Sequence, residues 1–310
     1  QLQRTRHTGV FIFVDQSSLY VTRSEIADNE SAYGGGGIYM ETCTNPLKLT
    51  NVTMANNTAW SQGGNDLFVT ACGTSMDEGL VTITNSTIWS SNSFSVSGDP
   101  AVSYSNIKSI NSGWDSGNNI DVNPSFVDAD NGDYHLTDHS ACIGMGTSSI
   151  PSATDFENNI TPDPAGSNPD IGAYENSRAD RLDDWYISTT GSDSNEGTST
   201  SPLATIAVAV AGAMDGDTIN LAAGTYQQTF DPAGADITLI GTAGSDSTTI
   251  DFSNFTDDDS NEFIGFDSGN DNNHYDSLTV KGITFTGKWD ANSDEPFFDI
   301  RGETSRPFTV

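Results

Sequence analysis

The chain has 310 residues and a formal net charge of −32, with 43 acidic and only 11 basic side chains. This charge argues against binding to nucleic acid or to an anionic membrane, because both need a basic protein surface. No apolar stretch approaches the roughly 18 residues that span a bilayer, so no membrane insertion is expected in this segment. The abundance of Asp, Gly, Ser, Thr and Asn favours a chain that turns often and argues against a helical protein.

Three similar segments recur in the first half of the chain. Residues 20–29, 48–57 and 83–92 each alternate apolar and polar side chains and end in Asn. Alternation with a period of two predicts a strand with one buried face. Its return about every 28 to 34 residues predicts the stacked coils of a parallel β-solenoid, with a β-sandwich as the alternative. The inner face of the stack would carry Val21, Leu49 and Ile83.

The corners of the predicted coils carry two further sets of stacked residues. Asn29, Asn57 and Asn92 are expected to form a ladder whose side-chain amides bond from coil to coil. Cys43 and Cys72 occupy equivalent positions in successive coils, where neighbouring strands lie about 4.8 Å apart, within reach of a disulfide. We therefore predict a Cys43–Cys72 bridge and an oxidising, extracellular location. Two stacked free thiols are the alternative.

One acidic turn has a spacing suited to calcium. Asp128, Asp130 and Asp133 surround a glycine turn, an arrangement that a hard, oxygen-binding cation can use. No distal bidentate Glu completes a loop pattern, so a solvated turn is the alternative. His135 and His139 lie nearby, but on a strand they would be about 13 Å apart, so zinc is not expected. Calcium is thus the one cofactor that the sequence suggests.

Several motifs in residues 121–175 arrive in a recognisable order. They are Asn123–Phe126, Gly132–Leu136, Ser140–Ile143 and Pro169–Glu175. This succession resembles the C-terminal end of secreted bacterial right-handed parallel β-helix proteins, which are often adhesin-like. The resemblance implies an all-β, right-handed parallel β-helix (a solenoid) and a secreted or cell-surface location.

A second group of motifs resembles the opposite end of such a fold. Trp185–Ser188, Ser201–Ile206, Gly216–Ile219 and Ala223–Tyr226 are similar to the N-terminal start of pectate-lyase-like β-helices. In that family a short helix covers the open end of the solenoid. The residues agree with a capping helix near 202–214, because Ser201 can cap it and Pro202 suits its first position.

The order of the two resemblances is inverted along the chain. Residues 1–175 read as the last coils of one β-helix, 176–184 as a polar linker, and 185–310 as the cap and first coils of the next. We therefore expect one period of a tandem array, or copies that meet end to end. An excerpt from two unrelated neighbouring β-helices is the alternative. The junction between successive periods or copies would be formed by Phe308, Val310, Gln1 and Leu2.

The function expected from these features is structural. The motifs of polygalacturonases and pectate lyases are missing from the chain, so no catalytic residue is assigned and an enzyme is disfavoured. The expectation is an extracellular structural or adhesive module, a repeat or subunit of a cell-surface fibre or filament, with copies of itself as partners. The alternative is a carbohydrate-active β-helix, a polysaccharide lyase or a glycan-binding protein that contacts surface glycans. Its candidate aromatic residues are Trp60, Trp89 and Trp114.

Overall fold

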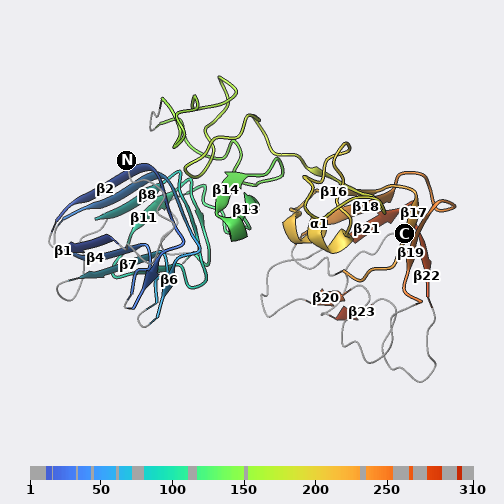
Figure 1. Cartoon of the computed structure of the whole chain (residues 1–310), viewed down its shortest axis with the longest axis horizontal. Helices are drawn as coiled ribbons and strands as arrows, with labels where there is room; N and C mark the ends of the chain where they lie inside the picture. Colours follow the sequence, from blue (N-terminus) through green and yellow to red (C-terminus); the bar gives the residue numbers. More distant parts are fainter. Residues whose placement is uncertain are drawn as a thin grey trace. The chain divides into compact units, whose positions relative to one another are not determined.

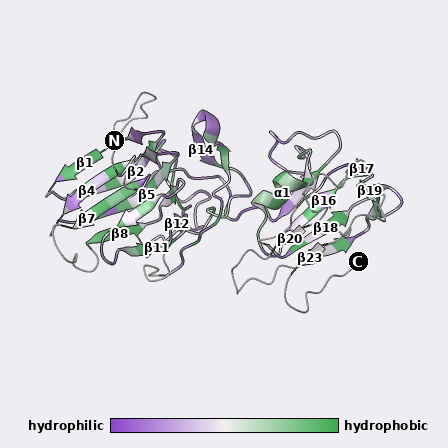
Figure 2. Ribbon diagram, turned by 90° about the horizontal axis from the view of Figure 1, so that it is seen from below, coloured by the Kyte–Doolittle hydropathy of each residue, from purple (hydrophilic) through white to green (hydrophobic). Residues whose placement is uncertain are grey.

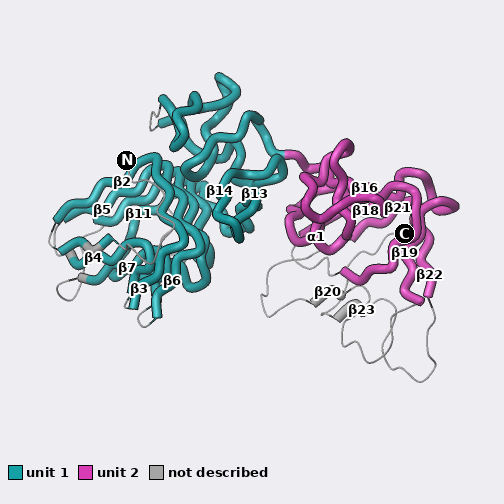
Figure 3. Tube along the Cα trace, viewed as in Figure 1, with its two compact units in different colours: residues 1–181 teal, residues 182–310 magenta. Residues whose placement is uncertain are grey.

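The structure is a computed structural model, and it divides the chain into two compact units, residues 1–181 and 182–310 (Figure 3). The boundary lies inside the predicted linker 176–184. The described residues are mostly β, in largely parallel sheets, with a single α-helix among them. The described ranges are 12–15, 17–32, 34–42, 45–60, 63–71, 80–110, 117–149, 153–230, 235–253, 265–267, 278–287 and 299–301.

Unit 1 contains two main parallel sheets (Figure 1). The first has the order β1 (Ile12–Asp15), β4 (Ile38–Thr42), β7 (Leu67–Ala71), β10 (Phe94–Val96). The second contains β2 (Leu19–Ala27), β5 (Leu47–Ala55), β8 (Val81–Thr84), β9 (Thr87–Trp89), β11 (Ala101–Ser103) and β12 (Asn106–Ile107). A small parallel pair is formed by β3 (Glu30–Ser31) and β6 (Thr58–Ala59).

The core of unit 1 is built from alternate residues of these sheets. Val21 pairs with Leu49, Leu49 with Ile83, and Ile83 with Val102. All four are buried in one cluster, which also contains side chains of the first sheet such as Met40. The predicted apolar ladder is therefore confirmed. Figure 2 shows hydrophobic segments along the strands.

The second sheet bends at one position in every segment. A residue with positive φ stands at each bend, and these residues are Arg23 (46°), Asn51 (52°), Asn85 (49°) and Tyr104 (50°). Asn tolerates this left-handed conformation better than most residues. Just beyond the bend, the Ser86 hydroxyl accepts the N–H of Val52 over 3.2 Å, and the Ser105 hydroxyl accepts the N–H of Ser86 over 3.2 Å. These hydroxyls satisfy backbone groups that the bend removes from the sheet.

Unit 1 ends in a more irregular segment, residues 117–181. It contains an antiparallel pair, β13 (Phe126–Asp128) and β14 (Asp133–Leu136), joined by the short 3-10 helix η2 (Ala129–Asn131). One small apolar cluster attaches this segment to the sheets, because it joins Tyr134 and Tyr174 to Ala55 of β5, and a second cluster lies within the segment itself.

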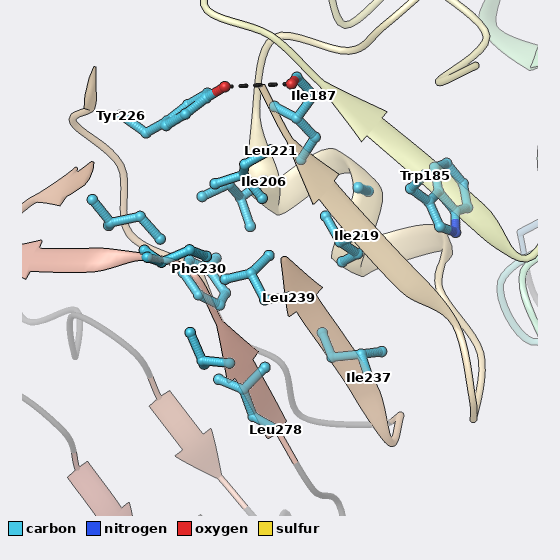
Figure 4. Packing of buried hydrophobic residues seen from close by; sticks show 14 of the residues in the cluster. Trp185, Ile187, Ile206, Ile219, Leu221, Tyr226, Phe230, Ile237, Leu239 and Leu278 are labelled. Carbon is cyan, nitrogen blue, oxygen red and sulfur yellow. Dashed lines mark hydrogen bonds between the residues drawn. The ribbon is translucent and has the colours of Figure 1, made fainter. Parts of the chain in front are cut away.

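Unit 2 repeats the parallel arrangement. One sheet has the order β15 (Asp184–Ile187), β16 (Thr218–Leu221), β18 (Ile237–Gly241), β21 (Leu278–Lys281). A second has the order β17 (Gly224–Tyr226), β19 (Thr248–Asp251), β22 (Thr284–Thr286), and a parallel pair is formed by β20 (Gly265–Asp267) and β23 (Asp299–Arg301). Figure 4 shows the apolar core of unit 2, where the Tyr226 hydroxyl donates to the carbonyl of Ile187 over 3.3 Å.

The helix predicted near 202–214 is shorter than expected. The structure has α1 over Ile206–Gly212, with Thr205 rather than Ser201 as its cap. Leu203 is held extended, because it donates its N–H to the carbonyl of Tyr186 over 2.9 Å and accepts the N–H of Ser188 over 3.0 Å. The helix can therefore begin only after Leu203. Within the described ranges, no helix is long and apolar enough to cross a membrane.

Candidate functional site

The first candidate site lies where the irregular end of unit 1 crosses the second sheet. Residues 171–174, which we call the crossing segment, pass over three neighbouring strands. Ala173 donates its N–H to the Thr53 hydroxyl of β5 over 2.9 Å, and the Thr87 hydroxyl of β9 donates to the carbonyl of Ile171 over 3.3 Å. The Tyr174 hydroxyl donates to the carboxylate of Glu25 in β2.

The three partners form one row across the sheet. Glu25 pairs with Thr53, and Thr53 pairs with Thr87. All three are buried, although the apolar residues next to them along the strands belong to the core on the opposite face. Since burying a polar group without a partner is unfavourable, the crossing segment both covers this row and satisfies it.

His135 of β14 stands beside the crossing segment. Its Nδ1 lies 2.6 Å from Asp133 Oδ1 and its Nε2 lies 3.2 Å from Glu157 Oε2, while its ring centroid is 4.2 Å from that of Tyr174. Burial lowers the pKa of His135, but the hydrogen bonds to Asp133 and Glu157 outweigh it, so its pKa lies above the ordinary value of 6.5. The imidazolium form thus links two carboxylates.

Two carboxyl groups next to the crossing segment are shielded from water, since Asp170 is buried and Glu175 is partly buried. Burial raises the pKa of Asp170 to about 8, although the N–H groups of Gly144 and Asn176, each 2.7 Å away, lower it. Burial raises the pKa of Glu175 to about 7, although the N–H of Asp170, 3.1 Å away, lowers it. Both can exchange a proton near neutral pH, which is the range where a carboxyl acts as an acid or a base.

A cavity of about 710 Å³ opens beside these groups. Carboxylates, amides and an imidazole share its wall with apolar side chains. A mixed lining of this kind suits a small polar ligand. The lining residues used below are His135, Asn158, Ile160, Asp163, Glu175 and Asn176.

The predicted calcium turn is largely occupied by contacts within the chain. Asp128 caps η2, and its carboxylate accepts hydrogen bonds from the N–H and the side-chain amide of Asn131. Asp133 pairs with His135, as described above. In the part of the chain that the structure describes, no group of three His, Cys, Asp or Glu side chains is arranged to hold a metal ion. Calcium at Asp128, Asp130 and Asp133 therefore stays a prediction.

The second candidate site is the predicted asparagine ladder. Asn29 donates its backbone N–H and its side-chain amide to Asn57 Oδ1, each over 3.0 Å. The next partner of Asn57 is Ser90, whose hydroxyl accepts the N–H of Asn57 over 3.0 Å. The structure does not bring Asn92 to this position. Ser90 takes the position instead, and Asn92, two residues further along the chain, is exposed.

A buried carboxyl completes this ladder. Asp66 Oδ1 accepts the side-chain amide of Asn57 and the hydroxyl of Ser90, each over 2.7 Å. No pattern in the sequence singles out Asp66, because its burial follows from the corner that precedes β7. The same holds for Glu157, which lies 22 residues from its partner His135 and meets it only in the folded chain. Asp170 and Glu175 lie in the motif Pro169–Glu175, but nothing in that motif predicts their burial.

The structure describes only some of the other residues that the sequence analysis singled out. Thr42 pairs with Ala71 immediately before Cys43 and Cys72, but both cysteines lie outside the described residues and the disulfide stays a prediction. Trp60 is 73% exposed, and Lys108 Nζ lies 5.3 Å from the ring centroid of Trp89. Trp114 and the junction residues Phe308, Val310, Gln1 and Leu2 also lie outside the described residues.

Comparison with known proteins gives one local match. A family described as a protein of unknown function (DUF1565) matches residues 189–234, which include α1, β16 and β17. This domain is associated with parallel β-helix proteins. No curated protein and no solved structure matches the chain.

Proposed function

We propose that the chain is a secreted or cell-surface structural module, a right-handed parallel β-helix that assembles end to end into an adhesive fibre. The observation that carries this proposal is a match between a strand of each unit. In unit 1, β2 bends at Arg23, where φ is 46°. In unit 2, β21 and β22 flank Gly282, where φ is 64°. Both segments therefore run straight, turn through a left-handed residue and run straight again.

The apolar positions match as well. Leu19, Val21 and Ile26 stand at the same distances from Arg23 as Leu278, Val280 and Phe285 do from Gly282. All six belong to the core of their unit or pack against it. Segments of equal shape can continue one apolar ladder when strand stacks on strand, whether they come from one longer polypeptide or from two copies.

Two further observations support the β-helix itself. Both units contain parallel sheets, and connections between parallel strands of one sheet are right-handed in almost all proteins. The match over residues 189–234 is to a domain associated with parallel β-helix proteins. The net charge of −32 would keep the sides of such fibres apart by repulsion, so that contact is left to the ends.

A proline in β2, which lies at the edge of the second sheet among the described strands, tests the end-to-end contact. Leu19 donates its N–H to the carbonyl of Pro46 before β5, so the alternation of a parallel strand directs the N–H of Tyr20 away from β5. Tyr20→Pro would remove this donor and leave the pairing with β5 intact. Sedimentation and electron microscopy of the purified chain should show linear assemblies, which Tyr20→Pro shortens and the matched Tyr20→Ala preserves. A wild-type chain that stays monomeric at every concentration would overturn the end-to-end assembly.

Glycan binding is a second candidate function, favoured by the cavity beside Glu175. Carboxylate and amide oxygens can accept hydrogen bonds from sugar hydroxyls, while Ile160 offers an apolar wall. Titration calorimetry with neutral and acidic oligosaccharides should then show binding that Asp163→Ala weakens. Absence of binding to every sugar tested would remove this candidate and leave the structural proposal unaffected.

A further inference from the structure

Asp66 is a carboxylic acid inside the core of unit 1, and none of its surface is exposed. Its Oδ1 accepts the two hydrogen bonds from Asn57 and Ser90 described above. Its Oδ2 is buried and has no hydrogen-bond partner. A buried carboxylate with an unpartnered oxygen is unfavourable when it is charged, and much less so when it is neutral.

The Asp66 carboxyl joins three segments of the stack. Asn57 follows β5, Asp66 precedes β7, and Ser90 follows β9. The backbone of Asp66 also pairs on both sides, because its carbonyl accepts the N–H of Ile38 over 2.8 Å and its N–H donates to Ser93 over 2.9 Å. Any loosening at Asp66 would therefore be transmitted to the segments on either side.

Few charged groups of the described residues act on this carboxyl. Lys108 is the charged group that lowers the pKa of Asp66 by attraction. The segments that carry its other partners, 57–60 and 85–93, contain no charged residue. In the preceding segment, the exposed Asp28 is bonded to Asn56 and Tyr134 instead.

We propose that Asp66 is a pH-responsive link between the stacked segments, tight when its carboxyl is neutral and loosened when it is ionised. The geometry gives the two states. In the neutral state the carboxyl holds Asn57 and Ser90 without burying a charge. In the ionised state the corner formed by residues 63–66 must open to let water reach Oδ2, and its bonds to neighbouring segments weaken.

The direction of the response follows from the pKa. Burial raises the pKa of Asp66 to about 7, although the hydrogen bonds from Asn57 and Ser90 lower it. In the opened corner the pKa returns toward its ordinary value of 3.8. The stabilisation is therefore complete below about pH 4, is lost as pH rises toward 7, and changes little above that. Opening can increase by at most ~10-fold per pH unit within this window.

Two measurements test the proposal. Carbon-13 titration of the aspartate carboxyls, with Asp66 assigned through Asp66→Asn, should show a midpoint near 7. Hydrogen exchange at the amides of Ile38, Asp66 and Leu67 should be compared in wild type and Asp66→Asn at about pH 4.5 and about pH 7.5. The ratio of wild-type to variant opening should rise at least ~10-fold between these values. Asp170→Asn is the matched control, since it removes another high-pKa carboxyl of the unit. At the same three amides, the ratio of wild-type to Asp170→Asn opening should be the same at both pH values.

Each outcome decides the question. A midpoint near 4, or a ratio that is the same at both pH values, overturns the proposal. If Asp66→Asn does not fold, Ser90→Ala replaces it. Removing the Ser90 donor should move the carboxyl midpoint to higher pH, and an unchanged midpoint would equally contradict the link.

Discussion

The backbone N–H of Ala173 donates to the hydroxyl of Thr53, 120 residues earlier in the chain, over 2.9 Å. This bond fixes the crossing segment to the middle strand of the three that it covers. Because Thr53 is 2% exposed, water cannot replace it as a partner. The contact therefore holds the end of unit 1 on the sheet, next to the cavity.

Thr53→Val should destabilise unit 1. The substitution keeps the shape of the side chain but leaves the buried N–H of Ala173 without an acceptor, which corresponds to about 1–3 kcal/mol. Thr22→Val is the control, because Thr22 is exposed on β2 of the same sheet. Urea unfolding should show a lower free energy of unfolding for Thr53→Val alone. Equal values for both variants would mean that the contact contributes nothing.

Gly172→Ala tests the close approach of the same segment. Gly172 has a φ of 124°, and an added Cβ would lie 2.9 Å from Thr53 Oγ1. Gly166 has a φ of 99° but nothing within 4 Å of an added Cβ. Gly166→Ala therefore reports the backbone strain, about 1–3 kcal/mol, and Gly172→Ala should lose more. Thermal unfolding of the two variants measures the difference, and a similar loss in both would argue against tight packing on Thr53.

The sequence predicts some of these features and not others, for physical reasons. The apolar ladder through Val21 and Leu49 could be predicted, because alternation is a local signal of which face is buried. The predicted start of the helix was too early. Leu203 is held extended by hydrogen bonds to a neighbouring strand, and the sequence around Leu203 gives no sign of these bonds. The Asn92 prediction failed because Ser90, two residues earlier in the chain, takes the ladder position, and a small error in register moves a side chain to another position. The buried polar row of Glu25, Thr53 and Thr87 could not be predicted from the sequence around each residue. Its hydrogen-bond partners in the crossing segment lie more than 80 residues later in the chain.

Asn57→Ala should be more damaging than Asn29→Ala. The side chain of Asn57 accepts the backbone N–H and the side-chain amide of Asn29 and donates to Asp66 and to the carbonyl of Ile26, so Asn57→Ala removes all four bonds. Asn29→Ala removes only the bond from the Asn29 side-chain amide. Removing Asn57 leaves several buried groups unsatisfied, which corresponds to about 2–4 kcal/mol. Denaturant unfolding of both variants would measure this order. A larger loss of unfolding free energy in Asn29→Ala than in Asn57→Ala would contradict this prediction.

The stability of unit 1 should fall as pH rises, in part through Asp170. The pKa of this carboxyl is raised from 3.8 to about 8, so the folded state binds its proton more tightly than the unfolded state does. Its contribution is complete below about pH 4 and is lost as pH rises toward 8, by at most about 1.4 kcal/mol per pH unit. Free energies of unfolding measured across this window should fall less steeply in Asp170→Asn than in wild type. Identical slopes would exclude Asp170 as a source of the pH dependence.

Thr205→Ala should destabilise the start of α1. The Thr205 hydroxyl accepts the N–H of Val208 over 3.4 Å and donates to Asp193 Oδ2 over 3.0 Å, so it joins the helix to the loop before it. Losing a helix cap corresponds to about 1 kcal/mol. Thr200→Ala is the control, because Thr200 is exposed and lies before the helix. Hydrogen exchange at the amides of Val208 and Ala209 should quicken in Thr205→Ala and remain as in wild type in Thr200→Ala. Unchanged exchange in Thr205→Ala would show that Asp193, which also accepts the N–H groups of Ala204 and Thr205, is enough to hold the helix start.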